Sequence, residues 1–160
     1  MLSITRKTDY ALVALADLAR RGPALASARD LASRLQVPLP ALTNILNRLT
    51  HRGLVCSVRG ANGGYRLARH PDQITLGELI EAVEGPVRLT RCCSDRATMD
   101  ATQCEREAAC DLRAPLHKVH ESFRTFLSQV TLRDLAWNHV SLNVGNTTAT
   151  PLFDQEPNGS

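Results

Sequence analysis

Several common functional signals are missing from this sequence of 160 residues. No apolar run approaches the roughly 20 residues that a transmembrane helix needs, and the polar residues 1–10 lack the apolar core of a secretory signal. The sequence also contains no paired Cys-x-x-Cys, no phosphate-binding loop and no evident nucleophile–base set. These absences argue against a membrane protein and against an enzyme, and we expect a cytoplasmic protein without catalytic activity.

The overall composition, with 43% hydrophobic and 22% charged residues, is that of an ordinary globular protein. The length predicts one domain with appendages. The five cysteines are odd in number and irregularly spaced, which argues against a disulfide framework in a reducing compartment. Metal binding, redox chemistry and simple burial remain open for them.

The net charge of +3 is unevenly distributed along the chain. Residues 1–70 contain 11 Lys or Arg and 3 Asp or Glu, a balance of +8, whereas residues 71–160 contain 8 and 13, a balance of −5. A basic half with few acids is typical of a polyanion binder, because neutralised phosphates release counterions. The alternative is a solvated basic surface.

Three short helices are predicted in the basic half. Apolar spacing indicates a first helix over 10–18 and a second that Ser27 caps and that ends near Gln36. Residues 37–40 form a tight turn into a third helix, which runs to about Arg52 and is closed by Gly53. Two short helices joined by such a turn form the helix-turn-helix pattern.

The third helix has two different faces. Its apolar residues repeat at helical spacing and should face the core: Leu42, Ile45, Leu46 and Leu49. Its other side presents amide, hydroxyl and cationic side chains, which suit base edges and phosphates. We therefore predict DNA contacts from Pro40, Thr43, Asn44, Asn47 and Arg48. The alternative is the solvated face of a structural helix.

A β-hairpin follows, with strands expected over 54–58 and 65–68 around a glycine turn. A hairpin directly after a recognition helix forms a wing, and Arg59 at its tip is placed to enter a minor groove. We also assign Tyr65 to the DNA-binding set. The predicted fold class is mainly α with a small β-hairpin, and residues 1–70 form a winged helix-turn-helix.

The remaining chain divides into three predicted segments. Residues 71–111 hold a linking helix over 76–83, which Gly85 and Pro86 stop, and then a cysteine-bearing loop. Residues 112–138 form a helix whose apolar stripe suits a homodimer interface, with core packing as the alternative. Residues 139–160 are expected to be a disordered tail.

Three segments resemble the Rrf2 family of bacterial winged-helix regulators. They are residues 2–12 (Leu-Ser-Ile-Thr-Arg-Lys-Thr-Asp-Tyr-Ala-Leu), residues 59–69 (Arg-Gly-Ala-Asn-Gly-Gly-Tyr-Arg-Leu-Ala-Arg), and Ile-Thr-Leu at 74–76 with Ala-Val-Glu-Gly-Pro at 82–86. The resemblance covers about residues 1–135 and is strongest to the regulators of SUF-type iron–sulfur cluster assembly, close to the IscR-like and NsrR-like branches. It implies a homodimer that reads a pseudo-palindromic double-stranded DNA operator and senses cluster status, oxidant or nitric oxide.

Four of the cysteines lie within nineteen residues, and clustered thiolates suggest a soft metal or an iron–sulfur cluster. The spacing alone does not decide between them. The family resemblance implies that Cys92, Cys104 and Cys110 are cluster ligands and that Cys93 is spare. It leaves the cluster type, 2Fe-2S or 4Fe-4S, open.

The fourth ligand separates the two branches of the family. IscR-like members place a histidine where this sequence has Arg113, which cannot ligate. NsrR-like members take an aspartate from the partner subunit's first helix, which implies Asp9 here, although an acid in the first turn of a helix has a purely structural explanation too. His117 is the second choice, and His120 is expected to be solvated. The alternative function is a regulator with a zinc site or a thiol switch and no cluster.

Overall fold

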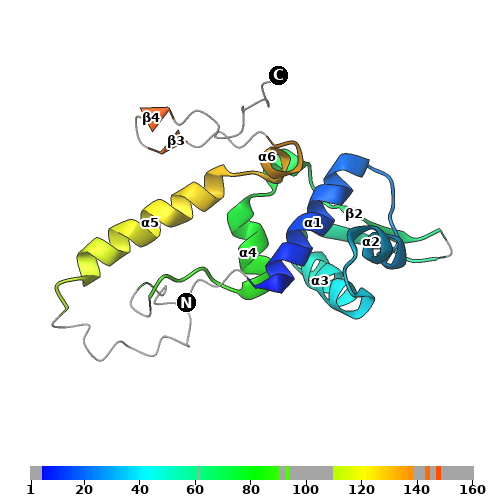
Figure 1. Cartoon of the computed structure of the whole chain (residues 1–160), viewed down its shortest axis with the longest axis horizontal. Coiled ribbons are helices and arrows are strands. Elements are labelled where there is room, and N and C mark those ends of the chain that lie inside the picture. The colour runs from blue at the N-terminus through cyan, green and yellow to red at the C-terminus, as the bar shows by residue number, and fades with distance from the viewer. Residues whose placement is uncertain are drawn as a thin grey trace, which may run out of the picture.

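The computed structural model describes residues 5–60, 62–90, 93, 110–138, 143–144 and 147–148. The fold is mainly helical with a small antiparallel hairpin, so the predicted fold class is confirmed. A head formed by α1 (Arg6–Arg21), α2 (Ala28–Leu35), α3 (Leu39–His51), β1 (Val55–Val58) and β2 (Gly64–Leu67) stands at one end of the molecule. Figure 1 shows α4 (Leu76–Glu84) between this head and α5 (Arg113–Gln129), which extends away from it.

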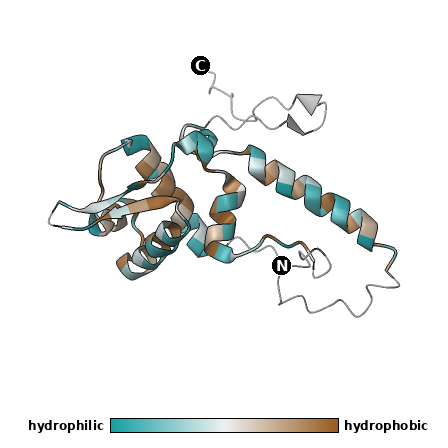
Figure 2. Cartoon of the chain, turned by 180° about the vertical axis from the view of Figure 1, so that it is seen from behind, coloured by the Kyte–Doolittle hydropathy of each residue, from teal (hydrophilic) through white to brown (hydrophobic). Residues whose placement is uncertain are grey.

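The first helix begins four residues earlier than its apolar spacing predicts. Thr5 caps it by accepting a hydrogen bond from the Lys7 amide over 3.1 Å, so the polar first turn is helical too. Ser27 caps α2 as predicted, and α3 ends within one residue of the expected position. The main core is formed by hydrophobic residues of α1, α2, α3 and the hairpin, and Figure 2 colours such residues brown along these ribbons.

The wing is a two-stranded ladder tied to the loop between α1 and α2. Val55 pairs with Leu67 and Val58 with Gly64. Ala26 and Tyr65 exchange two backbone hydrogen bonds of 3.0 and 2.8 Å, which makes Ala26 a third rung beside β2. A Cβ at Gly64 would lie 2.7 Å from the Ala26 carbonyl oxygen. The glycine therefore permits the close backbone approach that fixes the wing on the head.

The linking helix α4 follows a short 3₁₀ turn, η1 (Pro71–Gln73). A capping box between Thr75 and Glu78 sets its start. It contacts α1 and α3 on the head side and α5 on the other. Its position between them makes α4 the connection from the DNA-binding head to the C-terminal helices.

The segment predicted as one helix over 112–138 is divided into α5 and α6 (Leu132–Ala136). The break has a local cause, because Thr131 and Asp134 form a second capping box that starts a new helix. The break is also held from outside. The Leu76 amide donates to the Val130 carbonyl and the Leu132 amide donates to the Ile74 carbonyl, both over 2.8 Å.

The apolar stripe of α5 is only partly covered. Near its C-terminal end, Phe123, Phe126 and Leu127 pack with Ile80 of α4 and with Val87, and the two phenylalanine rings stack at 6.5 Å. Towards its N-terminal end, 57% of Val119 is exposed. Core packing and an unburied stripe are therefore both present on this helix.

Most of the predicted tail and of the cysteine-bearing loop lies outside the described residues. Within the tail, β3 (Asn143–Val144) pairs with β4 (Thr147–Thr148) in a short antiparallel ladder. The disorder expected of residues 139–160 remains a prediction. Across the described ranges, none of the helices has the length and apolar character required to cross a bilayer.

Candidate nucleic-acid interface and cysteine segment

The second and third helices are arranged as the sequence predicts. Gln36 adopts a left-handed conformation, with φ of 53°, at the end of α2, and Val37 is buried beneath the turn. The predicted apolar face of α3 is fully packed, and none of its four residues is more than 3% exposed. The opposite face is available to a ligand, since Pro40, Asn44, Asn47 and Arg48 are exposed and Thr43 is half-buried.

A basic hollow of about 520 Å³ lies between the start of α1 and the outer face of α3. Its polar and charged lining comes from Arg6, Lys7, Tyr10, Asn44 and Arg48. Within the described part of the chain, Arg6 and Lys7 form no ion pair. The cations Arg6 and Lys7 on one concave surface suit a phosphate group, and Asn44 brings a base-reading amide to the same place.

The C-terminal end of α4 contacts the two helices that form the hollow. Arg48 donates from Nη1 to the Val83 carbonyl over 2.6 Å. Thr5 and Thr8 donate from their hydroxyls to Glu84 Oε1 over 2.5 and 2.6 Å. These contacts join residues 35 to 79 positions apart in the sequence. No local spacing signals them, and our sequence reasoning did not find them.

Glu84 titrates in a mixed environment. Burial raises the pKa of its carboxyl group, but the hydrogen bonds from Thr5 and Thr8 and the nearby charge of Lys7 lower that pKa by more. The net result is a pKa below the ordinary value of 4.5. Glu84 is therefore an anion at neutral pH and a full acceptor for both hydroxyls.

The wing presents Arg59 at an exposed position directly after β1, as predicted. Tyr65 is not fully exposed as a simple DNA contact would be. Its side chain is half-buried and packs against the main core. Its backbone also carries both hydrogen bonds to Ala26. The predicted DNA contact of Tyr65 remains a prediction, and the structure adds an anchoring role for the same residue.

The structure describes only one of the three predicted cysteine ligands. Cys92 and Cys104 lie outside the described residues, whereas Cys110 is a half-buried free thiol three residues before α5. Cys93 is only 3% exposed. Its Sγ accepts from the Thr90 hydroxyl over 3.2 Å and approaches the Leu116 carbonyl of α5 at 3.8 Å. Among the described residues, no three His, Cys, Asp or Glu side chains are grouped closely enough to hold a metal.

The candidates for the fourth ligand have contrasting surroundings. Asp9 is exposed in the first turn of α1. His120 was expected to be solvated, and that expectation is wrong, because only 3% of it is exposed. Nε2 of His117 and Nδ1 of His120 are both buried without a hydrogen-bond partner among the described residues. Buried ring nitrogens normally have a partner, so a polar group or an ion is expected beside this part of α5.

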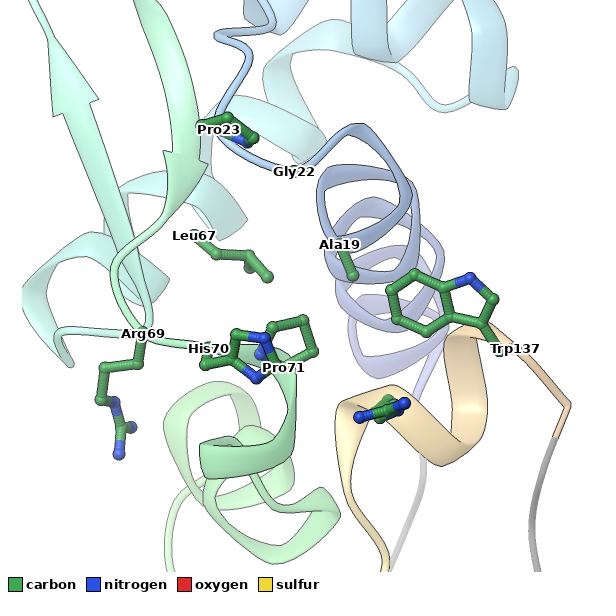
Figure 3. A pocket seen from close by; sticks show the side chains of 9 residues that line it. Ala19, Gly22, Pro23, Leu67, Arg69, His70, Pro71 and Trp137 are labelled. Atoms are coloured by element: carbon green, nitrogen blue, oxygen red, sulfur yellow. The ribbon is translucent and has the colours of Figure 1, made fainter.

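A second cavity, of about 590 Å³, lies at the other end of α1 (Figure 3). Trp137 and Leu67 contribute apolar surface, and Arg69, His70 and Arg133 contribute the basic side chains. Each of these three is within ion-pair distance of a carboxylate: Arg69 of Glu78 at 3.1 Å, His70 of Asp72 at 3.0 Å and Arg133 of Asp72 at 3.2 Å. Among the described residues, the two arginines of this cavity are therefore each paired with a carboxylate, unlike Arg6 and Lys7 in the basic hollow.

A helix-turn-helix with an exposed polar face, a wing and a basic hollow beside them defines a winged-helix DNA-binding protein. Comparison with known proteins agrees. A model of the Rrf2 family, described as an iron-dependent transcriptional regulator, matches residues 4–138. The chain belongs to the Rrf2 family of transcription regulators, which confirms the resemblance found in the sequence. These proteins are DNA-binding regulators and not enzymes.

Three relatives illustrate the range within the family. An rrf2-like HTH-type regulator of Rhodobacter capsulatus is 34% identical over 155 residues, covering 94% of this chain and 99% of that protein. NsrR of Shouchella clausii is 30% identical over 142 residues (88% and 93%). IscR of Pectobacterium atrosepticum is 31% identical over 152 residues (93% and 88%).

Solved structures show the same fold. CymR, the global cysteine regulator of B. subtilis, superposes with a TM-score of 0.64 at 30% identity, covering 86% of this chain and 98% of that one. IscR of T. potens superposes with a TM-score of 0.64 at 29% identity, covering 87% and 89%. The family therefore includes proteins named for cysteine regulation as well as the IscR and NsrR types.

Proposed function

We propose that this regulator reads its operator with α3 in the major groove and the wing in an adjacent minor groove. The exposed polar face of α3 and the basic hollow beside it are the observations that support this arrangement. Thr43, Asn44 and Asn47 read base edges, and Pro40 lies on the same face. Arg48, also predicted from the sequence as a DNA contact, supports this face through its hydrogen bond to the Val83 carbonyl. Arg59 enters the minor groove, and Tyr65 supports the wing from its base.

The protein acts as a homodimer through α5. Val119 is 57% exposed on this helix and Leu112, just before it, is 65% exposed. A second copy of α5 would cover such residues in a symmetric interface. Two heads related by a twofold axis then match the two halves of a pseudo-palindromic operator.

An iron–sulfur cluster sets the affinity for DNA. Cys92, Cys104 and Cys110 hold it with thiolates, and Asp9 of the partner subunit supplies the fourth ligand. The donor set fits such a group, because thiolates are its usual ligands, Cys110 is a free thiol and Asp9 is exposed. When bound, the cluster provides a centre that reacts with oxidant or nitric oxide, and the target genes are those for cluster assembly.

Cysteine variants of the full chain, purified without oxygen, test the ligand set. Replacing Cys92, Cys104 or Cys110 by Ala should abolish the visible absorption of the cluster and the acid-labile sulfide. Cys56→Ala and Cys93→Ala are the matched controls and should keep both. Asp9→Ala should give a cluster that forms but decays, because one oxygen ligand is lost while three thiolates remain. Bleaching by Cys93→Ala with retention in Cys92→Ala would show that the register is off by one residue.

A thiol switch or a zinc site is the second candidate. The observation that favours it is the structural likeness to CymR, the global cysteine regulator of B. subtilis, together with the half-buried free thiol of Cys110. If protein purified without oxygen contains zinc and no acid-labile sulfide, the cluster is ruled out and a zinc site takes its place. If it contains no metal at all, a thiol switch takes its place. Gel shifts of the operator with oxidised and reduced protein would then give the affinity difference.

A further inference from the structure

The last two residues of α4 lie at a junction of three helices. A helix ends with carbonyl groups that have no partner within it, and cations next to them are stabilising. The last turn of α4 has no basic residue of its own. Arg48 of α3 supplies the missing cation, because its Nη1 donates to the Val83 carbonyl. The recognition helix is thereby attached to the end of α4 by a charge-assisted hydrogen bond.

The neighbouring residue attaches α1 to the same point. Glu84 accepts hydrogen bonds from both Thr5 and Thr8, and the side chain of Thr8 is completely buried. This turn of α1 also carries Arg6 and Lys7, which line the basic hollow. We call the contacts of Arg48, Thr5 and Thr8 with Val83 and Glu84 the α4 clamp.

The cysteine segment, residues 85–110, begins at the next residue. Gly85 adopts φ of 91°, which ends α4 and turns the chain away. Val87 then packs with Ile80 of α4 and Leu127 of α5 in the smaller hydrophobic cluster between these helices, and Cys93 contacts α5. Because Gly85 directly follows Glu84, a change in the position of residues 85–90 acts on the end of α4, within two residues of both halves of the clamp.

We propose that the α4 clamp couples the cysteine segment to the DNA-binding surface, and that Arg48 is a positioning residue within it. Arg48 holds α3 against α4, and Glu84 holds the start of α1. The basic hollow lies between α3 and the start of α1, so both of its sides move when the end of α4 moves. When the cysteine segment changes state, the two walls move together and the operator affinity changes. The coupling rests on the proposed sensing function, whereas the positioning role of Arg48 does not.

The salt dependence of operator binding by the full-length dimer distinguishes positioning from phosphate contact. Loss of one phosphate contact lowers the slope of log K against log salt by about 0.9. Arg48→Met should weaken binding about tenfold, the size of one charge-assisted hydrogen bond, with an unchanged slope. Arg6→Met should flatten the slope. Arg133→Met, far from the hollow and paired with Asp72, should change neither.

Arg48→Lys keeps a cation that can donate to the carbonyl, so it should recover most of the affinity and also covers the case in which Arg48→Met does not fold. A slope that falls by about one unit in Arg48→Met, matching Arg6→Met, would make Arg48 a phosphate contact and overturn its positioning role. Full affinity in Arg48→Met would overturn it as well.

The coupling is measured as the ratio of operator affinities between the cluster-bearing and cluster-free forms. Glu84→Ala should bring this ratio towards one while leaving the cluster absorption unchanged. Glu84→Gln keeps an oxygen acceptor and should retain more of the ratio. If the wild type has a ratio well away from one and Glu84→Ala keeps it, the clamp proposal fails and the sensing function stands. If the wild-type ratio is one, both the sensing function and the coupling fail.

Discussion

Replacing Gly64 by Ala tests how the wing is held on the head. The added Cβ would lie 2.7 Å from the carbonyl oxygen and 2.8 Å from the carbonyl carbon of Ala26, both backbone atoms. Ala26 cannot move aside without losing its two hydrogen bonds to Tyr65. Each such bond contributes about 0.5–1.5 kcal/mol net, so Gly64→Ala should lower the free energy of unfolding by about 1–3 kcal/mol.

Gly64→Ala should also weaken operator binding, because the added Cβ displaces the wing and the wing carries Arg59. Urea unfolding followed by circular dichroism gives the stability, and fluorescence anisotropy with a labelled operator gives the affinity. Gly77→Ala is the matched control. Its Cβ would meet only Leu127, at an ordinary contact distance of 3.4 Å, so it should be neutral or slightly stabilising. Wild-type stability and affinity in Gly64→Ala would refute the argument that Ala26 fixes the wing.

Three further predictions concern charge and recognition. Arg59→Ala should cost about 1–3 kcal/mol of operator binding, and wild-type binding should weaken steeply with salt in a titration from low to high ionic strength; binding that ignores salt would contradict the basic footprint. Asn44→Ala should change which operator is preferred, whereas Lys7→Ala should weaken specific and random DNA alike; equal losses for Asn44→Ala would remove it from the base-reading set. The folded pKa of Glu84 lies below its ordinary value of 4.5, so its stabilising contribution is present above that pH and is lost as pH falls through the folded pKa; urea unfolding across pH 6 to 3 should show the wild type losing more stability than Glu84→Gln, and parallel curves would count against the hydrogen bonds to Thr5 and Thr8.

Local signals in the sequence were sufficient for most of the head. The spacing of Leu42, Ile45 and Leu49 marks the buried side of α3, and Ser27 and Gly53 mark helix ends through their capping chemistry. The first turn of α1 was missed because its residues are polar and only the Thr5 cap shows that they are helical. The break at Val130 was missed because the apolar stripe continues through it.

The site was less accessible to such reasoning wherever distant segments meet. The outer face of α3 could be predicted from its residue types, and the exposure of Asn44 and Asn47 agrees with that prediction. The bond from Arg48 to Val83 and the burial of His120 could not, since both depend on how α4 and α5 pack. A charged or aromatic side chain has the same sequence signature whether it contacts solvent, DNA or another helix.

Two backbone hydrogen bonds join residues 74–76 to residues 130–132 and hold the C-terminal end of α5 in place. That end is therefore the pivot for any change in the direction of the helix. Seventeen residues of helix reach about 25 Å from that pivot at 1.5 Å per residue. A rotation of only about 5° at the pivot therefore displaces the far end of α5 by about 2 Å over that length. Hydrogen bonds to base edges tolerate only a few tenths of an ångström. In a dimer joined through α5, small angular changes are thus sufficient to move one head out of register with its half-site while the other remains bound.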